Sequence, residues 1–118
     1  MKRRELKAKR YLQRKNRVRA RVVGTEKRPR LSVFRSNTHI YAQIINDEKG
    51  VTLVGFSDAK IKKEKMTKTQ MAQMVGEEIA KKALAKKIKT VTFDRNGFRF
   101  HGRVKAVAEG ARSGGLVF

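Results

Sequence analysis

LSVFRSNTHIYAQII (Leu31–Ile45) alternates apolar and polar side chains in two short runs that a polar turn separates. A period of two places successive side chains on opposite faces of a strand. Leu31–Ser36 and His39–Ile45 are therefore predicted to be two strands of an antiparallel hairpin. One face of this hairpin is apolar, and the other carries the side chains Ser32, Phe34, Ser36, His39, Tyr41 and Gln43.

The sequence on the C-terminal side predicts two more strands and two helices. Val51–Ser57 and Thr90–Phe93 have strand patterns, while a Thr67–Gln70 capping box precedes apolar residues at helical spacing. A last helix is predicted from Val104, Val107, Ala108 and Ala111. Because a helical crossover requires parallel pairing, the sheet is predicted to be mixed. The predicted fold is a small α/β sandwich in the order β-β-β-α-β-α, with a sheet of about four strands packed against two helices.

Positive charge is concentrated at the N-terminus. Residues 1–30 hold 14 of the 31 Lys and Arg residues and 2 of the 10 acids, and 9 of those 14 are Arg. Self-repulsion predicts a basic arm at residues 1–24 that is disordered when free, followed by an α/β domain at residues 25–118. Part of the arm is predicted to become helical when phosphates neutralise its charge. The sign of this is a weak helical spacing of apolar residues, made by Leu6, Tyr11, Leu12 and Val18.

A net charge of +21 on 118 residues indicates a polyanionic partner. Arg binds phosphate through a planar fork, and exposed aromatic rings stack on unpaired RNA bases. The arm and the polar face of the hairpin are therefore candidate RNA-binding surfaces. Two other interpretations stay open, namely a solubilising role for the arm and simple packing of Phe34 and Tyr41 beneath the arm or a loop.

Catalytic, metal and cofactor sites are not predicted. The chain has no Cys, and its two His residues, His39 and His101, belong to no nucleophile motif. Asp94 lacks the acidic neighbours that a nuclease on a ribonuclease-H-like fold needs, so we expect it to cap a turn. No apolar run approaches the roughly 18 residues of a membrane span. The charged start also lacks the apolar core of a secretory signal, although an Arg-rich start is shared with mitochondrial transit peptides.

Four segments resemble bacterial large-subunit ribosomal protein eighteen, whose family is universal. They are RPRLSVFRSNTHIYAQIIND (28–47), VGEEIAKKAL (75–84), FDRNGFRFHGRVKAVAEGAR (93–112) and GLVF (115–118). Two positions depart from the family pattern. Lys87 stands where a helix-ending Gly is expected, and Gly110 stands where Ala is usual, at a cost of about 1 kcal/mol to the helix.

The resemblance implies a structural constituent of the large ribosomal subunit, not an enzyme, located on the cytoplasmic ribosome. Such a protein binds 5S rRNA and helps attach it to 23S rRNA in the central protuberance, as a monomer beside neighbouring ribosomal proteins and away from membranes. The alternative is a nonspecific RNA-binding or chaperone protein. The resemblance and the residue types together give these candidate RNA contacts: Arg3, Arg4, Arg10, Arg14, Arg17, Arg19, Arg21, Arg28, Arg30, Ser32, Phe34, Arg35, Ser36, Asn37, His39, Tyr41, Gln43, Arg95, Phe98, His101 and Arg103. For His101, a hydrogen-bonded loop position is an equal interpretation.

Overall fold

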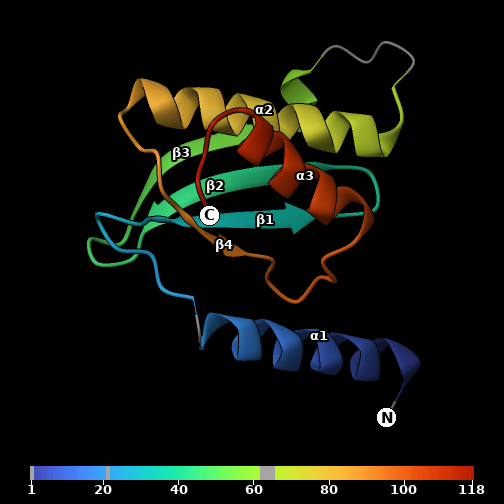
Figure 1. Cartoon of the computed structure of the whole chain (residues 1–118). Helices are drawn as coiled ribbons and strands as arrows, with labels where there is room; N and C mark the ends of the chain where they lie inside the picture. Colours follow the sequence, from blue (N-terminus) through green and yellow to red (C-terminus); the bar gives the residue numbers. More distant parts are fainter. Residues whose placement is uncertain (1, 21, 62–65) are drawn as a thin grey trace.

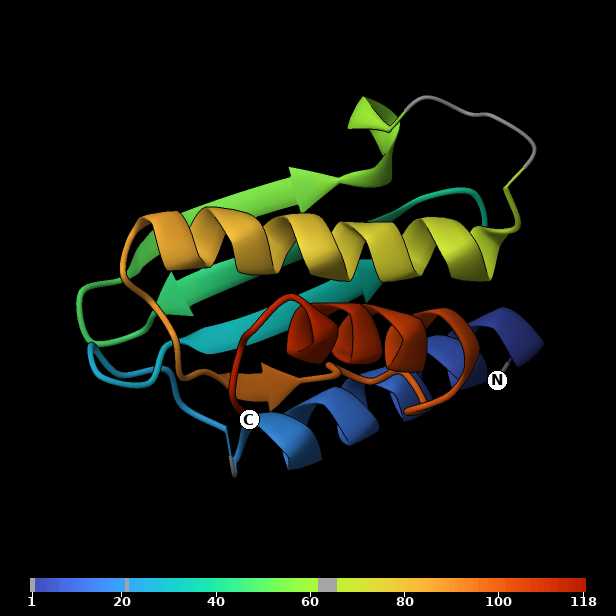
Figure 2. The same ribbon diagram turned by 45° about the horizontal axis from the view of Figure 1, so that its top comes forward.

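A sheet lies between two layers of helix in the computed structural model, which describes residues 2–20, 22–61 and 66–118 (Figure 1). In these residues the strands are β1 (Arg30–Arg35), β2 (Ile40–Asn46), β3 (Val51–Ser57) and β4 (Thr92–Asp94). The helices are α1 (Arg3–Arg19), α2 (Lys68–Ala85) and α3 (Gly102–Ser113), and a short 3-10 helix covers Asp58–Lys60. Figure 2 shows α2 and α3 side by side over one face of the sheet, with α1 beyond the other.

The sheet is mixed, as the sequence predicted. The strand order is β3-β2-β1-β4, with antiparallel pairs β1–β2 and β2–β3 and a parallel pair β1–β4. The crossover from β3 to β4 runs through α2, which begins with the predicted capping box, because Thr67 and Gln70 exchange hydrogen bonds of 3.1 and 3.0 Å. The predicted α/β fold and its β-β-β-α-β-α order are confirmed.

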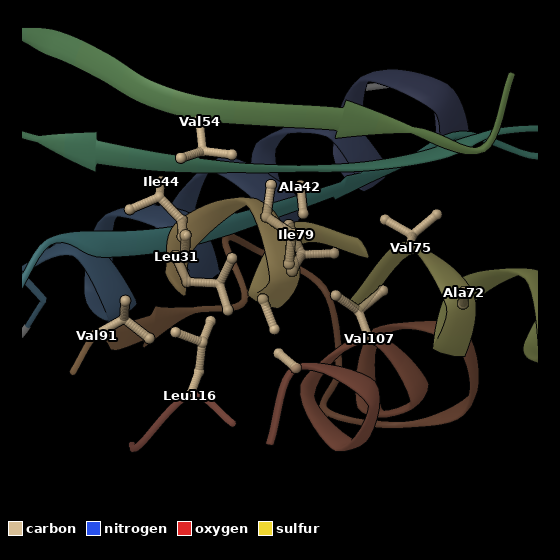
Figure 3. Close-up of a cluster of buried hydrophobic side chains, with 14 of the residues drawn as sticks. Leu31, Ala42, Ile44, Val54, Ala72, Val75, Ile79, Val91, Val107 and Leu116 are labelled. Carbon is tan, nitrogen blue, oxygen red and sulfur yellow. The ribbon is translucent and has the colours of Figure 1, made fainter. Parts of the chain in front are cut away.

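The core forms between the apolar face of the sheet and the helices α2 and α3. Leu31 and Ile44 are fully buried on that face, opposite Ile79 of α2 and Val107 of α3 (Figure 3). Since these strand residues alternate with polar ones, the opposite face of the sheet stays free of the core. We call this opposite face, made of Ser32, Phe34, Tyr41, Gln43 and Gly55, the polar face.

Two glycines set the distance between α2 and α3. A Cβ atom on Gly76 would lie 2.2 Å from the carbonyl oxygen of Val107, and one on Gly110 would lie 2.1 Å from that of Gln73. Both distances are far below contact, so neither helix has room for a methyl group. The helix-propensity cost expected of Gly110 is therefore accompanied by a packing role that the sequence did not indicate, because Gly110 permits the close crossing of α2 and α3.

Lys87 follows α2 in the left-handed region, at a φ of 64°. A glycine adopts this conformation without strain, whereas a side chain with a Cβ does not. Lys87, which stands where the family pattern has a helix-ending Gly, thus lies where α2 ends, as expected.

The arm forms helix α1 in this structure. Tyr11 and Val18 of the predicted apolar spacing are half-buried, but Leu6 and Leu12 are exposed by 37% and 54%. The half-buried residues recur at three- and four-residue steps, so one face of α1 is turned toward the domain; they are Tyr11, Arg14, Lys15, Val18 and Arg19. The disorder expected of the free arm stays a prediction.

The substitution Gly110→Ala tests the close crossing. Alanine favours a helix over glycine by about 1 kcal/mol, so local preference alone predicts stabilisation. We expect the opposite, a loss of about 1–3 kcal/mol in the free energy of unfolding, because the methyl group forces α2 and α3 apart. Urea unfolding measures the sign of the change. The neighbouring exposed change Glu109→Ala should stay within about 0.5 kcal/mol of the wild type, and a stabilised Gly110→Ala protein would contradict the packing described.

Candidate nucleic-acid interface

Arg30 lies inside the protein between two carboxylates. Its Nε and Nη2 atoms donate to both oxygens of Asp47 at 3.0 and 3.1 Å, and Nη1 donates to Asp94 at 2.8 Å. Arg30 is only 9% exposed, and Asp94 is fully buried. Burial alone would lower the pKa of Arg30, but its hydrogen bonds to Asp47 and Asp94 outweigh that effect and raise the pKa. We therefore give Arg30 a structural role, and the phosphate contact that the resemblance implied for it stays a prediction.

Asp94 also shapes the turn after β4. Its second oxygen accepts the backbone N–H of Asn96 at 2.8 Å, which is the turn-capping role expected of it. Asn96 has a left-handed φ of 56°, and its side-chain amide donates to Ser32 Oγ at 3.0 Å and to the carbonyl of Val33 at 2.7 Å. Asp94 and Asn96 thus both hold the turn against β1, Asp94 through Arg30 and Asn96 through Ser32 and Val33.

Helix α1 docks on this turn. Arg14 Nε donates to the carbonyl oxygen of Gly97 at 2.9 Å, and the rings of Tyr11 and Phe98 lie 5.1 Å apart. A Cβ on Gly97 would lie 2.5 Å from the carbonyl oxygen of Tyr11, so only glycine allows this approach. Contacts between residues more than 80 positions apart in the chain therefore hold the arm against the domain.

Asp47 holds the other end of the arm. Its carboxylate accepts the backbone N–H of Gly24 at 2.6 Å and lies 3.5 Å from the guanidinium of Arg19. The hydrogen bonds from Arg30, together with the N–H of Gly24 and the charge of Arg19, lower the pKa of Asp47 to about 2 against the opposing effect of burial. The cluster of Arg30, Asp47 and Asp94, called here the Arg30 cluster, thus connects the sheet, the turn and α1.

Aromatic rings form a row from α1 to the polar face. Tyr11 contacts Phe98, Phe98 lies 5.7 Å from Phe34, and Phe34 lies 5.2 Å from Tyr41. Phe34 and Tyr41 nevertheless remain 40% and 38% exposed. Each of these two rings therefore packs against a neighbouring ring and is still exposed enough to contact a ligand.

Cationic side chains surround this row. On one side of α1, a hollow of 470 Å³ is lined by the cations Arg4, Lys7, Arg14 and Arg35 and by the rings of Tyr11 and Phe98. Arg35 also lies over the Phe98 ring, 5.3 Å from its centroid. On the other side, a groove of 240 Å³ separates α1 from the polar face. The combination of cations and half-exposed rings suits phosphates and unpaired bases of RNA.

The other arginines of the arm differ in solvent exposure. Arg3, Arg4, Arg10 and Arg17 are exposed, whereas Arg14 and Arg19 are half-buried and make the contacts given above. Arg21 lies outside the described residues. Arg28 is exposed, and its Nε donates to the carbonyl of Val91 at 3.3 Å.

The β1–β2 turn carries three further candidates, and Arg103 of α3 lies beside it. Ser36 Oγ accepts the backbone N–H of His39 at 3.1 Å, and the ring of His39 lies 3.2 Å from Asp58. The carbonyl oxygen of Asn37 accepts from Lys68 Nζ at 2.7 Å and from Arg103 at 3.5 Å. Burial lowers the pKa of Arg103, and the neighbouring charge of Arg35 lowers it further. Two cations that repel each other in this way are an arrangement that an anion would relieve.

The segment that follows β4 contributes the remaining candidates. Arg95 donates to the carbonyl of Phe98, which fixes the turn. His101 is the exposed residue that precedes α3, and its side chain makes no capping hydrogen bond there. Phe98 is therefore brought into the aromatic row, whereas His101 stands apart from it.

The sequence reasoning missed Lys15, Tyr11 and Asn96 as members of the interface. Lys15 and Tyr11 lie one turn apart in α1, a spacing that signals a shared helix face. Asn96 is followed by Gly97, a pair typical of turns, and this local pattern gives no sign that the amide of Asn96 reaches β1. Only the folded chain brings these residues beside Ser32 and Phe34.

In the part of the chain that the structure describes, no group of three or more His, Asp or Glu side chains is placed to hold a metal ion. Among the same residues, no helix combines the length and the apolar character needed to cross a membrane.

Comparisons with known proteins give a consistent result. The family model described as ribosomal L18 of archaea, bacteria, mitochondria and chloroplast matches residues 3–118. The large ribosomal subunit protein uL18 of Thermus thermophilus is 60% identical over 108 residues, covering 92% of this chain and 95% of the relative. The protein of the same name from Mycoplasma mycoides is 60% identical over 102 residues, covering 86% and 88%. That of Bdellovibrio bacteriovorus is 57% identical over 107 residues, covering 91% and 87%.

Replacing Asp47 by Asn tests the electrostatics of the Arg30 cluster. The pKa of Asp47 lies below its ordinary value of 3.8, so its contribution to stability is complete above about pH 5 and is lost as the pH falls toward 2. Asp47→Asn should lower the free energy of unfolding at pH 7 by about 1–2 kcal/mol and flatten its decrease between pH 5 and pH 2. Chemical unfolding across this pH range measures both effects. The exposed variant Glu109→Gln should keep the wild-type profile, and an unchanged profile in Asp47→Asn would contradict the role of Asp47.

Proposed function

The chain belongs to the ribosomal L18 family, and from that membership we propose that it binds 5S rRNA and helps attach it to 23S rRNA in the central protuberance. As a member it is a structural constituent of the large ribosomal subunit and not an enzyme. The observation that carries the proposal is the row of half-exposed rings beside α1, because it joins cations for phosphates to rings for bases on one side of the molecule.

The arm and the domain have different parts in the proposed binding. The exposed arginines of α1 are free to contact phosphates, and such contacts release counterions and supply affinity without reading sequence. The polar face and the turn after β4 are fixed by the Arg30 cluster, so their side chains keep a constant geometry. A fixed surface recognises the shape and unpaired bases of a particular RNA. We therefore assign affinity mainly to α1 and selectivity mainly to the sheet and its turns.

The alternative function is that of a nonspecific RNA-binding or chaperone protein. Such a protein would hold any RNA through its charge, and excess transfer RNA would displace 5S rRNA in proportion to its amount. The ordered rings of Phe34 and Tyr41 favour the selective function, because a purely electrostatic binder has no need of them.

A salt series with the arm variant Arg3→Gln, Arg4→Gln and Arg10→Gln separates the two parts. We expect the slope of log affinity for 5S rRNA against log salt to shrink by up to about 2–3, since each lost phosphate contact removes about 0.7–0.9. The preference for 5S rRNA over transfer RNA should remain. Fluorescence anisotropy with labelled 5S rRNA and unlabelled competitors measures both quantities.

The matched control removes three exposed charges from the side of the sheet that carries α2 and α3, with the changes Lys81→Gln, Lys89→Gln and Lys105→Gln. It has the same net charge as the arm variant, and its salt slope should stay close to that of the wild type. Equal loss of slope in both variants would contradict the placement of RNA on α1. A wild-type chain that prefers neither RNA would contradict the 5S function and support the nonspecific one.

A further inference from the structure

The groove between α1 and the polar face has a floor built from the two adjacent strands β1 and β2. Ser32 of β1 lies opposite Gln43 of β2, and Phe34 lies opposite Tyr41 two residues further along. On the other side of β2, Gln43 lies opposite Gly55 of β3, which has no side chain to cover it. The groove of 240 Å³ is smaller than the roughly 300–1,000 Å³ of sites for drug-sized ligands, so it suits one small planar group.

Tyr41 gives this floor a stacking surface. Phe34 is held between Tyr41 and the edge of Phe98, which fixes the orientation of both rings of the floor. Within the described part of the chain, Tyr41 contacts no aromatic ring except Phe34, and it is 38% exposed. A ring that is oriented on one side and open on the other stacks on nucleobases of any sequence.

Hydrogen-bonding groups lie beside the ring. Across residues 2–20, 22–61 and 66–118, no hydrogen bond occupies the half-buried amide of Gln43. The Ser32 hydroxyl accepts a hydrogen bond from Asn96 at 3.0 Å, and its own proton is left to donate. An amide next to a hydroxyl offers donors and an acceptor together, which is what the edge of a nucleobase requires.

Helix α1 forms the cationic wall of the groove through Lys15 and Arg19. Arg19 lies 3.5 Å from Asp47, whereas Lys15 is in no ion pair with any residue that the structure describes. A cation without a counterion at the mouth of a groove favours an anion there, and RNA places a phosphate beside every base.

We propose that this groove receives one unpaired RNA base, stacked on Tyr41, with its edge at Gln43 and Ser32 and its phosphate at Lys15 and Arg19. The proposal rests on the proposed function, because it names the part of the RNA that the same surface takes up. A base inside a double helix is paired and stacked, so the nucleotide comes from a loop, a bulge or an extruded position. Since α1 supplies one wall, capture of the base and docking of α1 stabilise each other.

The test uses the full-length chain, a 5S rRNA transcript, and chemical probing of the Watson–Crick edges of its unpaired bases. Tyr41→Ala removes the stacking surface and should weaken binding by about 5- to 150-fold. Gly55→Leu fills the open flank of Gln43 without removing any contact, since a Cβ there meets nothing nearer than Gln43 Cγ at 4.0 Å. In both variants, one unpaired base that the wild type protects should become reactive while the other protections persist.

The variant Gln43→Ala should restore the same reactivity with a smaller loss of affinity. Its control is Gln73→Ala, the same change at an exposed position of α2 on the other side of the sheet, which should behave as the wild type. Thermal unfolding of every variant identifies any that fail to fold, and Gly55→Leu decides the result if Tyr41→Ala is one of them. Wild-type affinity and protection in Gly55→Leu and Gln43→Ala would overturn the groove proposal with 5S binding intact. If the wild-type chain ignores the transcript at low salt, the proposed function itself fails.

Discussion

The guanidinium of Arg30 lies buried in a chain whose net charge is +21, and Asp47 and Asp94 make that position possible. Losing the fully buried Asp94 would cost about 3–5 kcal/mol, because the charge of Arg30 would be left without compensation inside the protein. Losing Asp47 costs less, about 1–2 kcal/mol, because its carboxylate is partly exposed. Each carboxylate also has a second task, since Asp47 accepts the N–H of Gly24 and Asp94 accepts that of Asn96. The position of the arm and the shape of the turn after β4 both depend on this one cluster.

The two faces of the sheet have different roles. The apolar face holds the core together with α2 and α3, whose close crossing depends on Gly76 and Gly110. The polar face does not contribute to the core and carries rings, amides and hydroxyls. Helix α1 lies on that side of the sheet (Figure 1). A short chain thereby combines a stable core with a surface that is shaped for a ligand.

Local patterns predicted what depends on neighbours in sequence. The alternation at Leu31–Ile45 was enough for the hairpin and its two faces, and the capping box was enough for the start of α2. The burial of Arg30 was not predictable, because its partners are 17 and 64 residues away and composition favours exposed arginine. Packing of the arm on the domain was one open interpretation, but its docking on the turn after β4 was not predictable, as the contact from Arg14 to Gly97 spans 83 residues. Close approach of two backbones, as at Gly110, leaves no local signal either.

Side-chain oxidation by hydroxyl radicals, followed by mass spectrometry with and without a 5S rRNA transcript, measures most directly which side of the protein meets RNA. The chain offers matched reporters, because Phe34 and Tyr41 are 40% and 38% exposed while Leu84 and Phe100, away from the polar face, are 40% and 45% exposed. We predict that RNA slows oxidation of Phe34 and Tyr41 several-fold and leaves Leu84 and Phe100 unchanged. Protection of Leu84 and Phe100 with Phe34 and Tyr41 still reactive would contradict an RNA-binding surface made of α1 and the polar face.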